Sequence, residues 1–159
     1  MPTTWLIPSW APNFHPLVIH FPIVLVMAAA VVDLVDVAFE RSAWLKSATT
    51  TLYITGALSL IVTFLTGLQA QGTVLIPGMA YPVLAEHRLW ALITMTSCIV
   101  VATLRLVVLR GNGARSRKRR IAMLGIGLVL VVLVQQTAER GARLVYEYGT
   151  GIIGAPAQR

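Results

Sequence analysis

Histidine is the residue type whose number and placement in this chain point most directly to chemistry. The chain has three histidines: His15 and His20 lie near its beginning, and His87 lies near its middle. Imidazole nitrogens are the commonest metal ligands in proteins, and two of them from different helices can hold the iron of a haem from both sides. The three histidines therefore define the first candidate site.

His15 and His20 cannot both bind one iron from a single continuous helix. Residues five apart on an α-helix are separated by about 140° around its axis, and His15 precedes Pro16, a residue that favours the first helical position. His20 is therefore the better ligand candidate, and we pair it with His87. Three roles stay open for His15: a supporting residue behind a ligand, a hydrogen-bond donor to a haem propionate or a quinone, or an interfacial side chain.

Three arginines near the histidines are candidates for binding the propionates of a haem. Arg88 directly follows His87, and Arg140 and Arg143 lie near the end of the last apolar stretch. A guanidinium group forms paired hydrogen bonds to a carboxylate. The same arginines are also expected at a membrane surface, where long cationic side chains reach toward water. Both roles stay open.

The elements that must position these residues are four long apolar stretches. They cover residues 16–39, 48–70, 85–109 and 121–146. A helix needs about 20 apolar residues to cross the hydrocarbon core of a membrane, and a chain with 57% hydrophobic and 12% charged residues is not an ordinary soluble domain. We predict an all-α integral membrane protein whose 159 residues form a single domain, a four-helix up-down bundle.

The basic residues predict how this bundle is oriented. Six of the thirteen lie between residues 110 and 120, and Arg41 and Lys46 lie in the first connection, whereas the residues before His15 and the connection 71–81 contain none. Cytoplasmic loops collect Lys and Arg. We therefore expect a bacterial inner-membrane protein with both termini in the periplasm. This topology accounts for the net charge of +7 without a nucleic-acid partner.

Two charged residues are expected to pair near the cytoplasmic face. Asp33 lies late in the first apolar stretch and Arg105 lies late in the third. An ionised carboxylate near lipid is costly unless it is paired. We predict a structural ion pair between Asp33 and Arg105, with Asp36 as the other carboxylate in reach. The single cysteine, Cys98, is predicted to be a small buried core residue.

Three further features concern how the helices meet. Pro22 has no amide proton for the carbonyl of Val18, so the first helix should bend near His20. Small residues spaced three or four apart in the second stretch are typical of close helix packing rather than of a cofactor slot; they are Gly56, Ser59, Thr63, Gly67 and Ala70. The four stretches show no internal repeat, which argues against a transporter.

The opening and closing segments carry a family resemblance. The opening H-P-L-V-I-H-F-P at 15–22, Asp33, His87 and the closing G-A-R-L-V-Y-E-Y-G-T-G at 141–151 together resemble the bacterial membrane-protein family called domain of unknown function 2231. The resemblance implies a four-helix inner-membrane protein without an assigned activity, sometimes joined or adjacent to redox modules such as Rieske-type iron–sulfur domains. Relatives often carry a histidine where this chain has Tyr148, which shifts the expected ligand role to His20 and His87.

Two functions stay open at this stage. The first is an electron-transfer subunit that holds a haem b near the periplasmic face and passes electrons between a periplasmic redox protein and quinone or a larger complex. The second is a cofactor-free accessory subunit of a respiratory or photosynthetic complex. The chain offers no nucleophile, no paired carboxylates at depth, no phosphate-binding loop and no Cys-x-x-Cys, so we expect no catalytic residues and no independent enzymatic activity.

Overall fold

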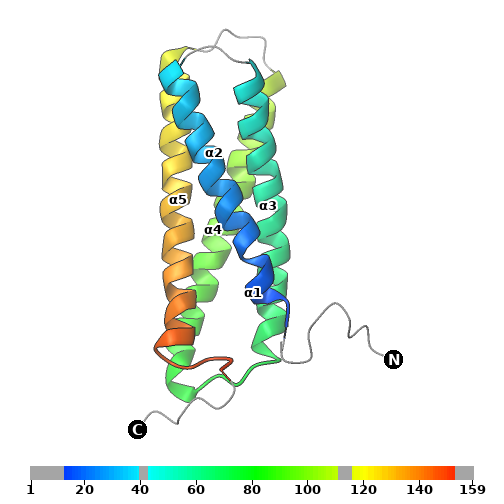
Figure 1. Cartoon of the computed structure of the whole chain (residues 1–159), viewed down its shortest axis with the longest axis vertical. Coiled ribbons are helices and arrows are strands. Elements are labelled where there is room, and N and C mark those ends of the chain that lie inside the picture. The colour runs from blue at the N-terminus through cyan, green and yellow to red at the C-terminus, as the bar shows by residue number, and fades with distance from the viewer. Residues whose placement is uncertain (1–12, 40–42, 111–115, 153–159) are drawn as a thin grey trace, which may run out of the picture.

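The chain folds into helices that lie side by side in one long bundle (Figure 1). The computed structural model describes residues 13–39, 43–110 and 116–152, and among them it contains no strand. The helices are α1 (His15–Val18), α2 (His20–Phe39), α3 (Ala43–Gln71), α4 (Tyr81–Arg110) and α5 (Arg117–Tyr146), with a short 3₁₀ helix, η1 (Gly78–Ala80), before α4. The all-α prediction is confirmed for these residues.

Within the described part of the chain, four helical segments are long and apolar enough to cross a membrane, as predicted. They are His15–Phe39, Trp44–Gln71, Gly78–Val107 and Arg117–Tyr146. Three of the helices begin roughly one turn before the predicted stretches. The reason is that the helical hydrogen bonds continue through polar residues at the ends, such as Lys46 and the basic run 117–120, which hydropathy alone leaves out.

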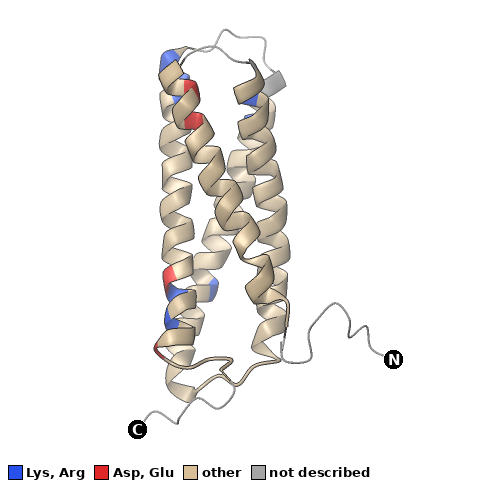
Figure 2. Ribbon diagram, viewed as in Figure 1, with Lys and Arg blue, Asp and Glu red and all other residues tan. Residues whose placement is uncertain are grey.

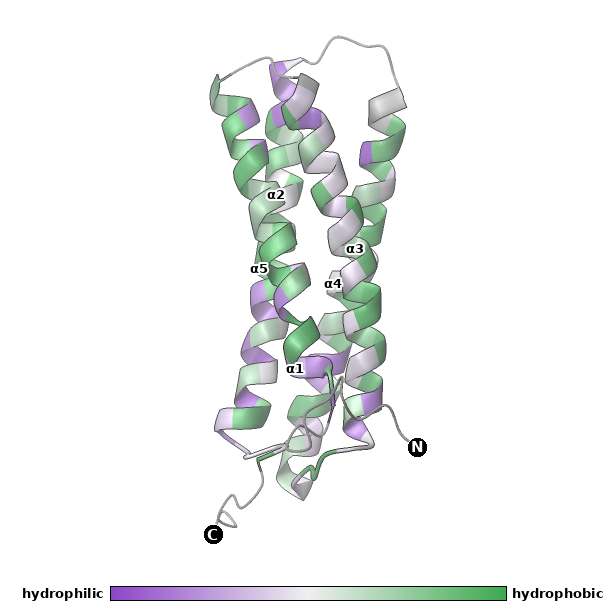
Figure 3. Ribbon diagram, turned by 45° about the vertical axis from the view of Figure 1, so that its right-hand side comes forward, coloured by the Kyte–Doolittle hydropathy of each residue, from purple (hydrophilic) through white to green (hydrophobic). Residues whose placement is uncertain are grey.

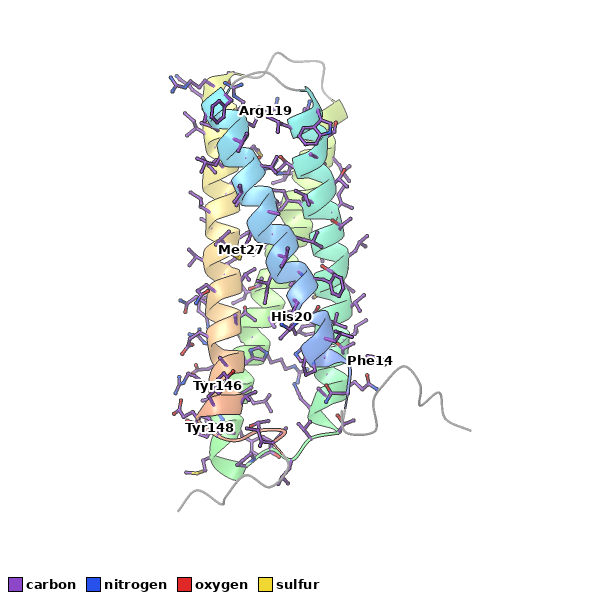
Figure 4. The ribbon with its side chains drawn as sticks, in the orientation of Figure 1. Phe14, His20, Met27, Arg119, Tyr146 and Tyr148 are labelled. Atoms are coloured by element: carbon purple, nitrogen blue, oxygen red, sulfur yellow. The ribbon has the colours of Figure 1, made fainter. Side chains whose placement is uncertain are left out.

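Neighbouring helices form a ring around a common axis. α2 packs against α3 and α5, and α4 packs against the same two helices, with consecutive long helices running in opposite directions (Figure 1). We call the end that carries His15 and His87 the histidine end, and the end that carries Asp33 and Asp36 the aspartate end. In Figure 4, Tyr148 marks the histidine end and Arg119 marks the aspartate end.

The surface of the bundle is polar in two bands and apolar between them. Lys, Arg, Asp and Glu gather toward the two ends of the helices and leave the middle uncharged (Figure 2), and the middle is largely hydrophobic (Figure 3). Large apolar side chains point outward there: Val24 is 62% exposed and Leu58 is 59% exposed. An apolar exterior of this extent is stable in lipid but would associate in water.

The first span is interrupted near the histidine end. α1 ends at Val18 and α2 begins at His20, so the helical pattern breaks at Ile19. Pro22 explains the break because it offers no amide proton to the carbonyl of Val18. The bend predicted from the sequence is present.

The buried residues of α2 and α4 reveal a structural repeat. Every buried position of α2 from Pro22 to Asp33 has a buried counterpart 72 positions later in α4. The pairs are Pro22 and Thr94, Val26 and Cys98, Ala29 and Val101, Ala30 and Ala102, and Asp33 and Arg105. The first and third spans therefore share one pattern of buried positions, and we describe the first two spans and the last two as two copies of one helix pair. This pattern is not visible in the sequence, because only one of these five pairs has identical residues.

In the second helix of each pair, an offset of 74 positions matches two buried residues of α3, Tyr53 and Gly56, with two buried residues of α5, Gly127 and Leu130. Tyr53 of α3 is fully buried, and its counterpart in α5 is Gly127. A methyl group on Gly127 would overlap the Tyr53 hydroxyl. The tyrosine of one copy thus occupies the space that the glycine of the other copy leaves open.

Candidate functional site

Asn13 fixes the beginning of α1 on the end of α3. Its side-chain oxygen accepts a hydrogen bond from the backbone N–H of His15 at 3.1 Å, which satisfies one of the free amides of the first helical turn. Its amide nitrogen donates to Thr73 Oγ1 at 3.1 Å. Since Asn13 is buried, these two bonds set both the position and the direction of the His15 side chain.

The His15 ring lies in a cradle formed by α3. Its Nδ1 is 3.2 Å from Thr66 Oγ1, and that hydroxyl donates its own proton to the carbonyl of Thr63 at 3.0 Å. Thr66 Oγ1 therefore accepts, and Nδ1 of His15 carries a proton. The floor of the cradle is Gly67, where an added Cβ would lie 3.0 Å from Cε1 of the ring. Only a bare backbone lets the ring approach this closely.

The His87 ring lies in a matching cradle formed by α5. Its Nδ1 donates to the backbone carbonyl of Thr137 at 3.0 Å. The floor is Gly141, where an added Cβ would lie 3.1 Å from Cε1 of the ring. The Thr137 hydroxyl is held in turn by Thr94 Oγ1 at 2.8 Å. His87 is thus bound to the α5 backbone as His15 is bound to α3.

The two cradles occupy equivalent places in the two copies of the repeat. His15 and His87 are 72 positions apart, as are Asp33 and Arg105. Their cradles are built from the same pattern, Thr-x-x-x-Gly, at 63–67 and 137–141. The copies therefore place two equivalent imidazoles at the same end of the bundle.

The two rings are held in the same tautomer. They lie close enough for a charge on one to act on the other. An acceptor fixes the proton on Nδ1 of each ring, which leaves the lone pair on Nε2. Neither Nε2 has a hydrogen-bond partner among the described residues. A hydrogen bond at one ring nitrogen orients the other for a ligand, so the pair offers two oriented nitrogen donors.

His20, the first choice from the sequence, lies elsewhere. It is exposed and lies just after the break between α1 and α2 (Figure 4). The sequence argument allowed only one of His15 and His20 to face the bundle, because they are about 140° apart. The structure turns His15 inward, since α1 already begins at His15. It is His15, and not His20, that the structure brings to His87.

The three candidate arginines occupy three different surroundings. Arg140 acts electrostatically on His87, lies 4.6 Å over the ring of Trp90 and is 3.5 Å from Glu86. Arg143 forms an ion pair with Glu147 at 2.7 Å. Arg88 is exposed and lines a groove between the end of α3 and the beginning of α4. Only Arg140 is placed beside a histidine.

The residues after α5 close the histidine end. Tyr148 is half-buried against a small cluster of Ala80, Val83 and Leu144. Glu147 lies past the last span, and the hydrogen bond from Arg143 lowers the pKa of its carboxyl group. This closing segment therefore has a packing and ion-pairing role in the structure.

The aspartate end is built around a buried ion pair. Arg105 donates to Asp33, the Tyr53 hydroxyl donates to the same carboxylate at 3.4 Å, and Arg105 lies 4.4 Å over the Tyr53 ring. Asp33 and Arg105 are 5% and 3% exposed. Cys98 is fully buried nearby, its thiol 3.9 Å from the Tyr53 carbonyl. Charges this deep are stable only when they are paired, so the cluster is a structural lock.

Among the described residues, no three His, Cys, Asp or Glu side chains come together as a metal site would require. A metal ion held by protein ligands alone therefore has no support there. Two imidazoles could be enough for a haem, because the haem itself supplies four nitrogen ligands to its iron and only the two axial ligands come from the protein.

A comparison with protein families decides the relationship of the chain. The model of the family described as predicted membrane protein (DUF2231) matches residues 11–154. The chain belongs to this family. The resemblance drawn from the opening and closing motifs is thereby confirmed. No curated protein and no solved structure matches the chain.

Sequence reasoning missed part of the site. Asn13, Thr66, Thr137 and Gly141 were not singled out, and Gly67 was assigned to helix packing alone. One signal in the sequence points to them: Thr-x-x-x-Gly occurs in the second and fourth spans at an offset close to that of His15 and His87. Reading the spans as two copies would have paired each histidine with its cradle.

Proposed function

We propose that this protein is a membrane electron-transfer subunit that holds one haem b at the histidine end, with His15 and His87 as the axial ligands. The observation that carries the proposal is the pair of equivalent imidazoles, each anchored through Nδ1 and each with an Nε2 lone pair and no partner among the described residues. They come from the first and third spans, on opposite sides of the bundle axis. When bound, the haem would supply reversible one-electron transfer.

Two buried polar atoms at the same end support a guest. Thr63 Oγ1, in the His15 cradle, has no hydrogen-bond partner, and neither does Nε of Arg140. Buried polar atoms are almost always satisfied. Arg140 Nε is a donor beside His87 and would suit a propionate, although Glu86 Oε2 lies 3.5 Å from it without forming a hydrogen bond.

The chain's own residues would do three things for such a group. His15 and His87 would hold it between the two copies of the repeat. Thr66 and the Thr137 carbonyl would keep both rings in the ligating tautomer. The apolar middle of the bundle, with Val26, Leu130 and Val134 buried, would keep water from its inner side.

The orientation of the bundle belongs to the same proposal. The basic run 117–120 and Lys46 lie toward the aspartate end, which we assign to the cytoplasm of a bacterial inner membrane. The histidine end and both termini would then face the periplasm. A haem there could exchange electrons with a periplasmic redox protein on one side and with quinone or a larger complex on the other.

One observation favours a second function, an accessory subunit without a cofactor. Each imidazole already fills the space over a glycine, where an added Cβ would lie 3.0 to 3.1 Å from the ring, so the same pairs could serve only to lock α1 onto α3 and α4 onto α5. Many exposed apolar side chains would then pack against other membrane subunits.

The spectrum of the purified protein separates the two functions. We expect a reduced-minus-oxidised difference spectrum of a six-coordinate haem b, lost in His15→Ala and in His87→Ala because both nitrogens are needed. The matched control is His20→Ala, which removes an exposed imidazole and should leave the spectrum unchanged. A colourless protein, purified intact with its partners, would contradict the haem proposal and leave the accessory subunit.

Cysteine labelling tests the orientation. Leu75 is 84% exposed at the histidine end, and Lys118 is exposed at the aspartate end. With the buried Cys98 replaced by alanine, an impermeant thiol reagent added to whole cells should label Leu75→Cys and should reach Lys118→Cys only after the membrane is opened. The reverse pattern would overturn the assignment of the two ends.

A further inference from the structure

The outside of the histidine end carries a groove that none of the interactions described so far uses. It lies between the end of α3 and the beginning of α4 and encloses about 460 Å³. The lining has a polar part and an apolar part. The polar side chains are Gln71, Tyr81 and Arg88, and the apolar ones include Leu84, Leu89 and Leu92.

Arg88 stands out among the arginines of this end because no carboxylate of the described residues pairs with it. Arg140 has Glu86 and Glu139 within ion-pair distance, and Arg143 is paired with Glu147. Arg88 is exposed on a membrane-spanning helix. A cation in this position is costly unless an anion or the interface neutralises it. We therefore expect a negatively charged group to bind next to Arg88.

The groove is polar at one end and apolar along its length. Side chains on a helix lean toward its N-terminus, so Arg88 reaches toward Tyr81 and Gln71 at the end of the bundle. Leu89 and Leu92 continue from Arg88 toward the middle of the membrane and are 55% and 43% exposed. The surface therefore offers three hydrogen-bond donors, one of them cationic, above an apolar strip.

We propose that this groove binds one phospholipid, with its phosphate on Arg88, Gln71 and Tyr81 and an acyl chain along Leu89 and Leu92. A phosphodiester matches the lining because it is an anion that accepts hydrogen bonds, and all three polar side chains donate them. A quinol fits less well, since its oxidation needs a proton acceptor and the lining holds neither a carboxylate nor an imidazole. The proposal is independent of the haem.

Native mass spectrometry can test this site. The full chain would be released from nanodiscs made of equal parts phosphatidylglycerol and phosphatidylethanolamine, and the retained lipid counted for each variant. Arg88→Gln removes the charge, and Ala85→Phe fills the groove beside it, where Ala85 is an exposed lining residue. The matched controls are Arg143→Gln, a half-buried arginine outside the groove, and Ala122→Phe, an exposed alanine of α5.

We expect one retained phospholipid per wild-type chain and in both controls, and at least a tenfold lower occupancy in Arg88→Gln and in Ala85→Phe. Occupancy that is unchanged in Arg88→Gln would overturn the site. Loss in Arg88→Gln with full retention in Ala85→Phe would mean that the phospholipid is held by Arg88 without entering the groove, and would overturn the site. Retention of a quinone in place of phospholipid, after the nanodiscs are doped with one, would overturn the choice of ligand.

Discussion

The polar residues at the two ends of the bundle differ in how fully they are paired with one another. At the aspartate end, Asp33, Arg105 and Tyr53 interact with one another inside the bundle. At the histidine end, His15 and His87 are each anchored on one nitrogen and lack a partner for the other among the described residues. Both ends use equivalent positions of the two repeat copies. One end therefore uses its equivalent pair for stability, and we propose that the other uses its pair to bind a ligand.

The difference lies in which residues the copies place opposite each other. At the aspartate end the copies differ in sign, with Asp33 in one and Arg105 in the other, so the two neutralise each other. At the histidine end they are identical, and two imidazoles with the same tautomer present two lone pairs and no proton between them. The charged pair is therefore complete by itself, whereas the proposal places a haem between the two imidazoles.

The largest expected effect comes from breaking the aspartate end. Arg105→Leu leaves the buried carboxylate of Asp33 without its cation, so the free energy of unfolding in detergent should fall by about 3–5 kcal/mol. The double variant Arg105→Leu with Asp33→Asn should recover most of the loss, because no charge then remains buried. Denaturant titration in mixed micelles gives both values.

Arg119→Leu is the control for this pair, since Arg119 is an exposed cation at the same end. It should change the stability by less than about 0.5 kcal/mol. If the double variant were as unstable as Arg105→Leu alone, the two residues would not be the interacting pair that the structure describes.

A smaller effect is expected from the glycine floors of the cradles. Gly67→Ala and Gly141→Ala each place a methyl group 3.0 to 3.1 Å from an imidazole carbon, so each ring must shift, at a cost of about 1–2 kcal/mol. Gly125→Ala is the matched control, because nothing lies within 4 Å of its added methyl and alanine favours a helix by up to about 1 kcal/mol.

The comparison between the two cradles sharpens this prediction. Because the copies are equivalent, Gly67→Ala and Gly141→Ala should destabilise the protein by similar amounts, whereas Gly125→Ala should be neutral or stabilising. Thermal unfolding of the three variants in one detergent provides the measurement. A stabilising effect at Gly67 or Gly141 would show that the rings do not rest on these glycines.

The sequence predicted the elements well because their signal is local. Four apolar stretches longer than a membrane is thick require four helices, and Pro22 predicts the break at Ile19 from the loss of a single amide. The ion pair of Asp33 and Arg105 is also foreseeable, since a lone charge in lipid needs a partner.

The candidate site was harder to predict because it depends on the direction of one helix turn. His15 and His20 would lie about 140° apart on a continuous helix, and the bonds of Asn13 to His15 and Thr73 and of His15 to Thr66 hold His15 inward. The repeat was hidden for a related reason. Its copies share burial at equivalent positions, which a single sequence does not display, and differ in most of the residues that fill them.

The midpoint potential of the haem in two methionine variants tests the central claim most directly. Exchanging an axial imidazole for a thioether raises the potential of a haem, while a change outside the ligand pair should not. In a spectroelectrochemical titration of the purified protein, the account predicts a haem b whose potential rises in His15→Met and stays unchanged in His20→Met. The absence of haem, or a rise in His20→Met with none in His15→Met, would contradict the account.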